Sequence, residues 1–548
     1  MTIEPAPATA SPGPAQPGTP APASVILEKD QRLSGSMLWK IQRSFFDAEG
    51  VRGWREGTIP QYITTNAFIA RAYARVALGW LRDCQAAGLD PDQPIYIIEL
   101  GSGSGRFAHG FLKYLFAWLD ALWPGRLQVR YVLTDFTDSN ISYWRSHPSF
   151  EPWLQAGRLD FASFDAARDN QIVLSRSGDV LAPGAVKNPL MAIANYVLDT
   201  LPQDAFTVHG GKLFESVITV ASTQEEPDLL APGLLERIQV SHSDRPLEGD
   251  YYAEPVFNHI LAGYRERLGH ASLLFPVAAL TCLANLERIA GGRVLFLAGD
   301  KGYHSASHII EVGDPGYVVH GGCFSMMVSF HTLGQYVLDR GGLFLSTAHQ
   351  HNSLDVCAFL LGPGGYPETR LAYEDSIERG GPDDFFLMKR ALGKAGEKLT
   401  VEEILGCLRL SGWDPDTLVG HAPRLLEALH DGEPGLHQDV LWAVRQAWDM
   451  YYPIGERPDL AFAAGLLLNT IRYYPEARRY LTWSLERYGP DADTLFNLAL
   501  CHHNLRDLPA ALACVKRALD LEPNFEEARD LRIRIEAELA LEARPATA

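Results

Sequence analysis

A glycine-rich turn after a short apolar segment is the strongest chemical signal in the sequence. The segment PIYIIEL contains Glu99, and Gly101, Gly103 and Gly105 follow before the helical pattern of RFAHGFLKYLFAWLDALW. Glycines accept positive φ and let a ligand approach the backbone without a Cβ in the way. The first amides of the next helix can then bind the ligand's polar atoms. A dinucleotide-binding turn would need a glycine at Arg106, so the spacing favours a different small ligand.

Polar residues end the next apolar segments in the same way. VRYVLTD ends at Asp135, RLDFASFD ends at Phe164 and Asp165, and PLMAIANYVLD contains Asn195 and Tyr196. Ligands of parallel α/β sheets bind beyond the carboxyl ends of the strands. Asp135 could accept hydrogen bonds from ribose hydroxyls and Asp165 from an adenine amino group, with Phe164 against the ring. Each residue alone is more often a helix cap or turn residue, but their order indicates a nucleoside site.

The pattern E-x-G-x-G-x-G resembles the first motif of class I S-adenosylmethionine (SAM)-dependent methyltransferases. A wider resemblance, over about residues 60 to 390, is to the MidA-type methyltransferases, a family that includes the mitochondrial complex I assembly factor that dimethylates an arginine. It rests on GTIPQYITTNAFIARAYARVALGWL, ELGSGSGRFA, ANYVLDTLPQDAF, RVLFLAGDKGY, HGGCFSMMVSFHTLGQYVLDRGG and AHQHNSLDVCAFLLG. The resemblance implies SAM as the cofactor, bound by Glu99, Gly101, Gly103, Gly105, Asp135, Phe164, Asp165 and Asn195.

Several polar residues of that family are replaced in this chain. Tyr196 stands where the family has a glutamate, and Cys323, Met327 and Ser329 stand where it has Asp, His and Asp. A guanidinium is always protonated near neutral pH and pairs best with carboxylates. The arginine substrate of the family therefore does not transfer to this chain, although the cofactor does.

Methyl transfer depends mainly on alignment of the acceptor and exclusion of water. The remaining candidates for orienting or deprotonating an acceptor are Asp199, Asp300 and Tyr196. Asp199 could equally be a helix cap or an ion-pair partner, and Tyr196 could be a stacking wall. Three functions stay open: a methyltransferase that acts on a protein side chain, a SAM-binding scaffold without catalysis, and a small-molecule methyltransferase.

Apolar segments that alternate with helices predict an α/β fold with a parallel sheet covered on both faces. The fold class expected is the Rossmann-like sheet of class I methyltransferases over residues 25–395. Residues of about 203–290 interrupt the alternation with an acidic, Pro-rich loop and a helical pattern. We interpret this stretch as an insertion over the active face, with a peripheral extension as the alternative.

The C-terminal part predicts an all-α domain. After a helical connector at 396–456, residues 457–548 fit two tetratricopeptide-type repeats and a capping helix. The 34 residues at 492–525 match that template, and 458–491 fit the same register. Small residues are expected where paired helices cross, at Gly465, Ala477, Ser484, Ala499, Ala511 and Ala518.

Composition restricts the partners. The 548 residues carry a formal charge of -19, which argues against nucleic-acid binding and weakly favours a basic protein or peptide substrate. The seven cysteines are scattered without a CxxC pair, so we expect a reducing compartment and no metal site.

Residues 1–24 are expected to be a disordered Pro/Ala-rich tail without signal-peptide features. No apolar run reaches membrane-spanning length. The expected location is cytoplasmic, with protein partners bound by the repeats.

Overall fold

The computed structural model describes residues 25–228, 231, 233–311, 316–351, 353–430 and 434–542, so the predicted N-terminal tail lies outside them. The chain divides into two compact units. The first contains the residues up to 65 and 72–383, and the second contains 66–71 and the residues from 384 onward. This boundary differs from the one predicted after residue 395. No helix in the described ranges is both long and apolar enough to cross a membrane.

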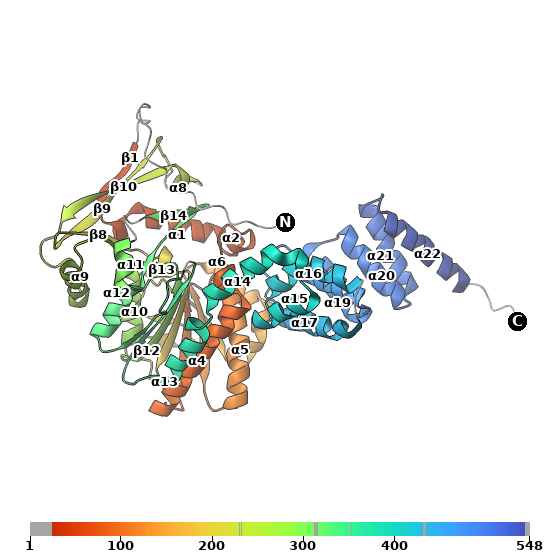
Figure 1. Ribbon diagram of the computed structural model, residues 1–548, viewed down its shortest axis with the longest axis horizontal. Helices are drawn as coiled ribbons and strands as arrows, with labels where there is room; N and C mark the ends of the chain where they lie inside the picture. Colours follow the sequence, from red (N-terminus) through yellow and green to blue (C-terminus); the bar gives the residue numbers. More distant parts are fainter. Residues whose placement is uncertain are drawn as a thin grey trace. The chain divides into compact units, whose positions relative to one another are not determined.

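The centre of the first unit is a seven-stranded sheet (Figure 1). Counted along the chain from the strand before the glycine turn, its strand order is 3-2-1-4-5-7-6. This is the Rossmann-like sheet of class I methyltransferases, which confirms the expected fold class. In sheet order the strands are β4 (Leu159–Ser163), β3 (Val129–Asp135), β2 (Ile95–Leu100), β7 (Leu190–Asn195), β12 (Val294–Asp300), β18 (Asp355–Leu361) and β17 (Leu343–Leu345).

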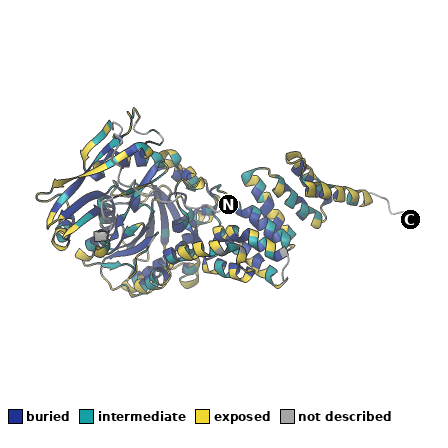
Figure 2. Ribbon diagram, turned by 45° about the horizontal axis from the view of Figure 1, so that its top comes forward, coloured by how far each residue is buried: buried dark blue, intermediate teal, exposed yellow. Residues whose placement is uncertain are grey.

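The five strands predicted from the sequence, β2, β3, β4, β7 and β12, run parallel as expected, and one further strand does not. β18 runs antiparallel to both of its neighbours, β12 and β17. Its residues DVCAFLL are all buried, as are those of β2 and β12. In Figure 2 the strands at the centre of the unit are mostly dark blue, the colour of buried residues. A continuous apolar run looks the same whichever way the strand points, so the sequence pattern does not reveal the direction.

Helices cover both faces of this sheet. On one side α10 (Val277–Ile289) and α12 (Phe330–Asp339) share a buried core with the strands. On the other, aromatic contacts join α4 (Ala67–Ala87) to α5 (Arg106–Leu122), and α5 to β3. The remaining helices of the unit include α6 (Asp138–Ser146), α7 (Glu151–Gln155), α11 (Ala306–Glu311) and α13 (Pro367–Tyr373).

A second, antiparallel sheet makes up most of the predicted insertion. It contains β1 (Val25–Gln31), β8 (Asp204–His209), β9 (Lys212–Ser222), β10 (Ile238–Pro246) and β11 (His270–Phe275). The helical pattern expected within it is present as α9 (Pro255–Arg267), and a short helix, α8 (Leu234–Arg237), precedes it. Because α10 begins at Val277 and belongs to the main core, the insertion ends near residue 275 and not near 290.

The second sheet anchors helix α1 (Met37–Glu49). Buried residues of α1 such as Met37, Leu38 and Ile41 pack in one core with residues of β9 and β11. Just before the helix, Arg32 forms a bidentate ion pair with Asp204 at the start of β8. α1 therefore has one face fixed on the sheet, and side chains of its other faces are free to line a site.

The second unit is all-α, as expected. Helices α15 (Val401–Leu410), α16 (Pro415–His430), α17 (His437–Asp449), α18 (Leu460–Thr470) and α19 (Tyr474–Tyr488) share one core. α20 (Ala492–Asn504), α21 (Leu508–Leu521) and α22 (Glu526–Glu542) form the next one. α14 (Pro382–Ala395) precedes them. The small residues expected at the helix crossings are all buried.

Replacing Gly465 by alanine is expected to destabilise the second unit. A Cβ on Gly465 in α18 would lie 2.6 Å from Leu481 of α19. Such overpacking costs about 1–3 kcal/mol, more than the ~0.5–1 kcal/mol that alanine contributes in a helix. A Cβ on Gly420 in α16 would meet no atom within 4 Å, so Gly420→Ala should be stabilising. Hydrogen exchange in the full chain measures both stability changes, through peptides of α18 and α19 for Gly465→Ala and of α16 for Gly420→Ala. Slower exchange of the α18 and α19 peptides in Gly465→Ala would contradict the close crossing of these helices.

Candidate cofactor and acceptor site

The glycine turn after β2 has the backbone that only glycine adopts without strain. Gly101, Gly103 and Gly105 have φ of +57°, +52° and +82°, and Gly105 is the N-cap of α5. A Cβ on Gly101 would lie 2.7 Å from Val197, and one on Gly103 would lie 2.7 Å from Trp54. The turn therefore needs glycine for its backbone conformation and for its neighbours.

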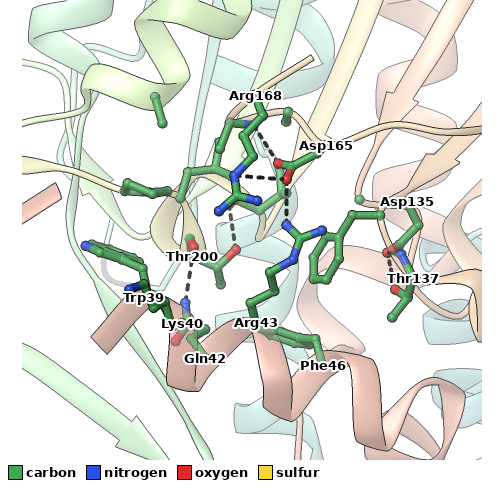
Figure 3. Close-up of a pocket in the computed structure, with 18 of the residues that line it drawn as sticks. Trp39, Lys40, Gln42, Arg43, Phe46, Asp135, Thr137, Asp165, Arg168 and Thr200 are labelled. Carbon is green, nitrogen blue, oxygen red and sulfur yellow. Dashed lines mark hydrogen bonds and ion pairs between the residues drawn. The ribbon is translucent and has the colours of Figure 1, made fainter. Parts of the chain in front are cut away.

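Asp135, at the end of β3, holds this turn in place. Its carboxylate accepts from the backbone N–H of Gly103 at 3.2 Å and from Asn140 Nδ2 at 3.0 Å. It also accepts from the N–H and the hydroxyl of Thr137 (Figure 3). Burial raises the pKa of Asp135, and these donors counteract the shift. These four donors already occupy the carboxylate oxygens. A ribose hydroxyl could therefore bond to Asp135, as predicted, only by displacing one donor or by sharing an oxygen with it.

A cavity of about 610 Å³ lies beside the turn, a size typical of small-ligand sites. Its lining includes Gly101, Asp135, Phe164 and Asp165 from the carboxyl ends of the strands, as the sequence predicts. It also includes residues of α1, which sequence reasoning did not place there: Trp39, Lys40, Gln42, Arg43 and Phe46. None of the described residues in 204–275 lines it, so the insertion contributes through α1 and not directly.

Asp165 is paired inside this cavity. Its Oδ2 accepts from Arg43 Nη1 at 2.5 Å, and Arg168 Nε lies 3.7 Å from the same oxygen. The other oxygen accepts from the N–H of Ala167 at 3.0 Å. The guanidinium of Arg43 also lies 4.2 Å from the ring centroid of Phe136, the residue after Asp135. Figure 3 shows Arg43 reaching from α1 toward Asp165.

A smaller cavity of about 130 Å³ adjoins the first. Both are lined by Gly101, Tyr196 and Thr200, and by Phe46 and Trp54, whose rings stack at 6.4 Å. The smaller cavity also has Glu99, Gly103, Asn195 and Asp199 in its lining, together with Lys301, His320 and Cys323. Of the predicted site residues, Gly105 and Asp300 alone line neither cavity.

Two side chains at the smaller cavity have unused hydrogen-bonding capacity. Both polar atoms of the Asn195 amide, and Oδ1 of Asp199, are buried and have no partner among the described residues. The N–H of Asp199 donates to Oδ2 of Asp300 at 3.1 Å. Buried polar atoms without partners are costly. These atoms therefore mark places where a ligand could bind.

Asp199 and Asp300 form a tightly coupled buried pair. Burial raises the pKa of Asp199 to about 7, and the positive charge of Lys301 opposes that shift. Burial and the charge of Asp199 raise the pKa of Asp300 well above its usual range. Asp199 is the member of the pair that lines the cavity, so it can exchange a proton with a bound molecule near neutral pH.

Tyr196 is poorly suited to the base role considered for it. Its hydroxyl donates to the carbonyl oxygen of Ser353 at 3.0 Å. Burial, followed by the charge of Asp300, raises its pKa further above its usual value. Its φ of +49° fixes the chain at this point in the left-handed region. These features favour the stacking-wall alternative, and they leave Asp199 as the strongest catalytic candidate.

Replacing Glu99 by glutamine is expected to remove a pH dependence of stability. Burial raises the pKa of Glu99 to about 8 from its usual 4.5, against the hydrogen bond from Tyr131. The protonated carboxyl therefore stabilises the fold, in full below the unfolded pKa, and this contribution is lost as pH rises through about 8. The melting temperature of the wild type should fall more than that of Glu99→Gln as pH rises from about 5 to about 9. Parallel pH profiles for the two proteins would show that Glu99 is not the group responsible.

The described residues contain one buried group with metal-ligand chemistry: His304, Asp355 and Cys357, with ligand atoms within 4.8 Å of one another. The sequence gives no sign of this group, because His304 lies 51 residues before Asp355. His304 Nδ1 lies 2.6 Å from Asp355 Oδ2, and the Cys357 thiol donates to Asp355 Oδ1 at 3.9 Å. These contacts join the three side chains to one another within the core, and the group lines neither cavity.

Comparisons with known proteins find similarity to solved structures alone. No protein-family model matches the chain, and no curated protein does. A solved structure thought to be a methyl transferase, from Burkholderia thailandensis and bound to S-adenosyl-homocysteine, is 17% identical with a TM-score of 0.34. That alignment covers 52% of this chain and 65% of the other, just under two thirds of its length.

Two further solved structures align with the chain at similarly low identities and TM-scores. A structure of an uncharacterized protein, also from Burkholderia thailandensis, is 15% identical, with a TM-score of 0.35 and coverage of 62% of this chain and 94% of the other. Magnesium protoporphyrin IX methyltransferase from Synechocystis, with bound S-adenosyl-homocysteine, is 10% identical, with a TM-score of 0.28 and coverage of 59% and 99%. At these identities and TM-scores the alignments do not assign a function to the chain.

Proposed function

We propose that the first unit binds SAM and that the chain is a SAM-dependent methyltransferase acting on a protein side chain. The observation that carries this proposal is the arrangement at the carboxyl ends of the strands. The glycine turn, Phe164 with Asp165, and Asn195 with Asp199 surround two adjoining cavities. A class I methyltransferase sheet places its ligand at this edge.

The larger cavity suits the adenosine part of the cofactor, because it offers an aromatic wall and a carboxylate at Phe164 and Asp165. The smaller one suits the amino-acid end, with the amides of the glycine turn, Glu99 and Asn195 in its lining. An ammonium group beside Glu99 would favour ionisation of that carboxyl. When bound, SAM supplies an electrophilic methyl group on a sulfonium.

The chain's own residues would prepare the acceptor. Asp199, with a pKa of about 7, can take a proton from an acceptor atom in the smaller cavity. Phe46 and Trp54 line both cavities and help to exclude water. We favour a protein side chain because the second unit is all-α and its successive helices share packed cores, an arrangement that suits binding of a peptide or protein partner.

The test has two stages. Calorimetric titration of SAM into the full chain should show saturable binding, and absence of binding would refute the proposal. Incubation with methyl-labelled SAM and cell extract should then label one or a few proteins. Labelling of small molecules instead would favour the small-molecule alternative.

A SAM-binding scaffold is the second candidate function. Asp135 and Asp165 are already paired within the protein, and the hydroxyl of Tyr196 is bound to a backbone carbonyl. Cys323, where the resembling family has an aspartate, lines the smaller cavity. Saturable SAM binding without any labelled acceptor would support this function over catalysis.

A further inference from the structure

Arg43 occupies the place in the larger cavity that suits a purine base. Its guanidinium lies against the ring of Phe136, 4.2 Å from the centroid, and donates to Asp165 Oδ2 at 2.5 Å. A guanidinium is flat and delocalised, stacks on aromatic faces and donates N–H groups in its own plane. An adenine with its exocyclic amino group presents the same combination of a flat face and an in-plane N–H donor.

We propose that Arg43 is an internal latch that fills the base position when no cofactor is bound and must leave for the adenine to enter. This inference rests on the proposed SAM site. It makes Arg43 a competitor of the cofactor and not one of its binding residues. Arg43 donates to Oδ2 of Asp165, an oxygen of the carboxylate that is expected to bind the adenine amino group.

The surroundings of Arg43 allow the side chain to swing without moving its helix. The apolar face of α1 is fixed in the core of the second sheet through Met37, Leu38 and Ile41. Asp47 lies four residues further along α1, where residues of a helix are neighbours. Burial raises the pKa of Asp47, the charge of Arg43 lowers it, and Asp138 and Asp165 raise it. Asp47 is therefore an alternative carboxylate within reach of the Arg43 charge.

Asp165 is not left without a cation when Arg43 moves. Arg168 Nε lies 3.7 Å from the same Oδ2 and its side chain is 70% exposed, so it can approach more closely. The Arg43 side chain itself is 35% exposed, which gives it a route to solvent. The carboxylate of Asp165 therefore has a cationic partner both when Arg43 fills the base position and when it has left. The movement of Arg43 requires only that Asp165 change its partner to Arg168.

The test is titration of S-adenosyl-homocysteine and of adenosine into the wild type, Arg43→Ala and Arg52→Ala. Removing the competing guanidinium should tighten binding of both ligands about three- to tenfold, because an ion pair and a stacking contact no longer have to be broken. Arg52, on the neighbouring α2 (Val51–Arg55), pairs with Glu49 and lines neither cavity. Its variant should bind as the wild type does. Raising the ionic strength weakens the ion pair of Arg43, so it should reduce the difference in ligand affinity between the wild type and Arg43→Ala.

Equal or weaker binding of S-adenosyl-homocysteine by Arg43→Ala, with a melting temperature like that of the wild type, would overturn the latch. It would mean that Arg43 stays and contacts the base. A gain with S-adenosyl-homocysteine but not with adenosine would also overturn it, since the effect would lie outside the base position. If none of the three proteins binds either ligand, the proposal of a SAM site is refuted, and the latch is refuted with it. The two failures are therefore distinguishable.

Discussion

Gly103→Arg is expected to abolish binding of SAM, while Gly125→Arg leaves it unchanged. Both glycines have positive φ, +52° and +68°. A Cβ on Gly103 meets the Trp54 ring at 2.7 Å, whereas one on Gly125 meets no atom within 4 Å. The arginine side chain at 103 must enter the cavity that the cofactor would use or displace Trp54 from it. We expect the affinity measured by calorimetry to fall by at least about 100-fold, or ~3 kcal/mol.

Comparing the two variants distinguishes an effect on the binding site from the effect of backbone strain. A non-glycine residue at positive φ costs roughly 1 kcal/mol at either position. The contact with Trp54 adds an overpacking cost at position 103 alone, so Gly103→Arg should melt at a lower temperature than Gly125→Arg. Gly125 follows α5 at the end opposite the glycine turn. Unchanged SAM affinity in Gly103→Arg would therefore exclude the turn from the binding site, and equal loss in both variants would point to a general effect of destabilisation.

The main sheet was predictable because its strands are continuous apolar runs that end in polar residues. Those runs placed β2, β3, β4, β7 and β12 and the candidate residues at their ends. The second sheet was not predictable in the same way. β10, with the residues IQVSHSDRP, is exposed over most of its length, so it has no apolar face for the pattern to reveal. Its pairing with β9 depends on the backbone and on partners distant in sequence.

The site was predictable where a residue acts from its own strand, and not where a distant segment closes it. Asp165 could be found as a strand-end carboxylate, but its partner Arg43 lies 122 residues away on a helix that the second sheet positions. Trp54 shows the same limit, because only the fold brings it against Gly103. Asp300 was a reasonable candidate by type and position, yet it lies fully buried behind Asp199 and lines neither cavity.

Asp199→Asn is expected to remove methyl transfer while SAM still binds. The substitution keeps the shape of the side chain and removes its capacity to accept a proton. Loss of a general base lowers the rate by about 10²- to 10⁴-fold, so labelling of the acceptor in cell extract should fall to background. Asp160→Asn is the matched control: Asp160 is also buried and bonded to backbone N–H groups, but it lines neither cavity. Its variant should lose stability and keep its labelling activity.

The pH dependence of labelling distinguishes a base from a residue that only positions the acceptor. Because Asp199 must be ionised to accept a proton and its pKa is about 7, the rate should rise with pH through that value and then level off. The charge of Lys301 lowers this pKa, so Lys301→Met should move the rise to higher pH, and Lys301→Arg should leave it in place. The acceptor's own titration is common to all three proteins and cancels in the comparison. A profile that Lys301→Met does not shift would mean that Asp199 is not the group whose ionisation limits the reaction.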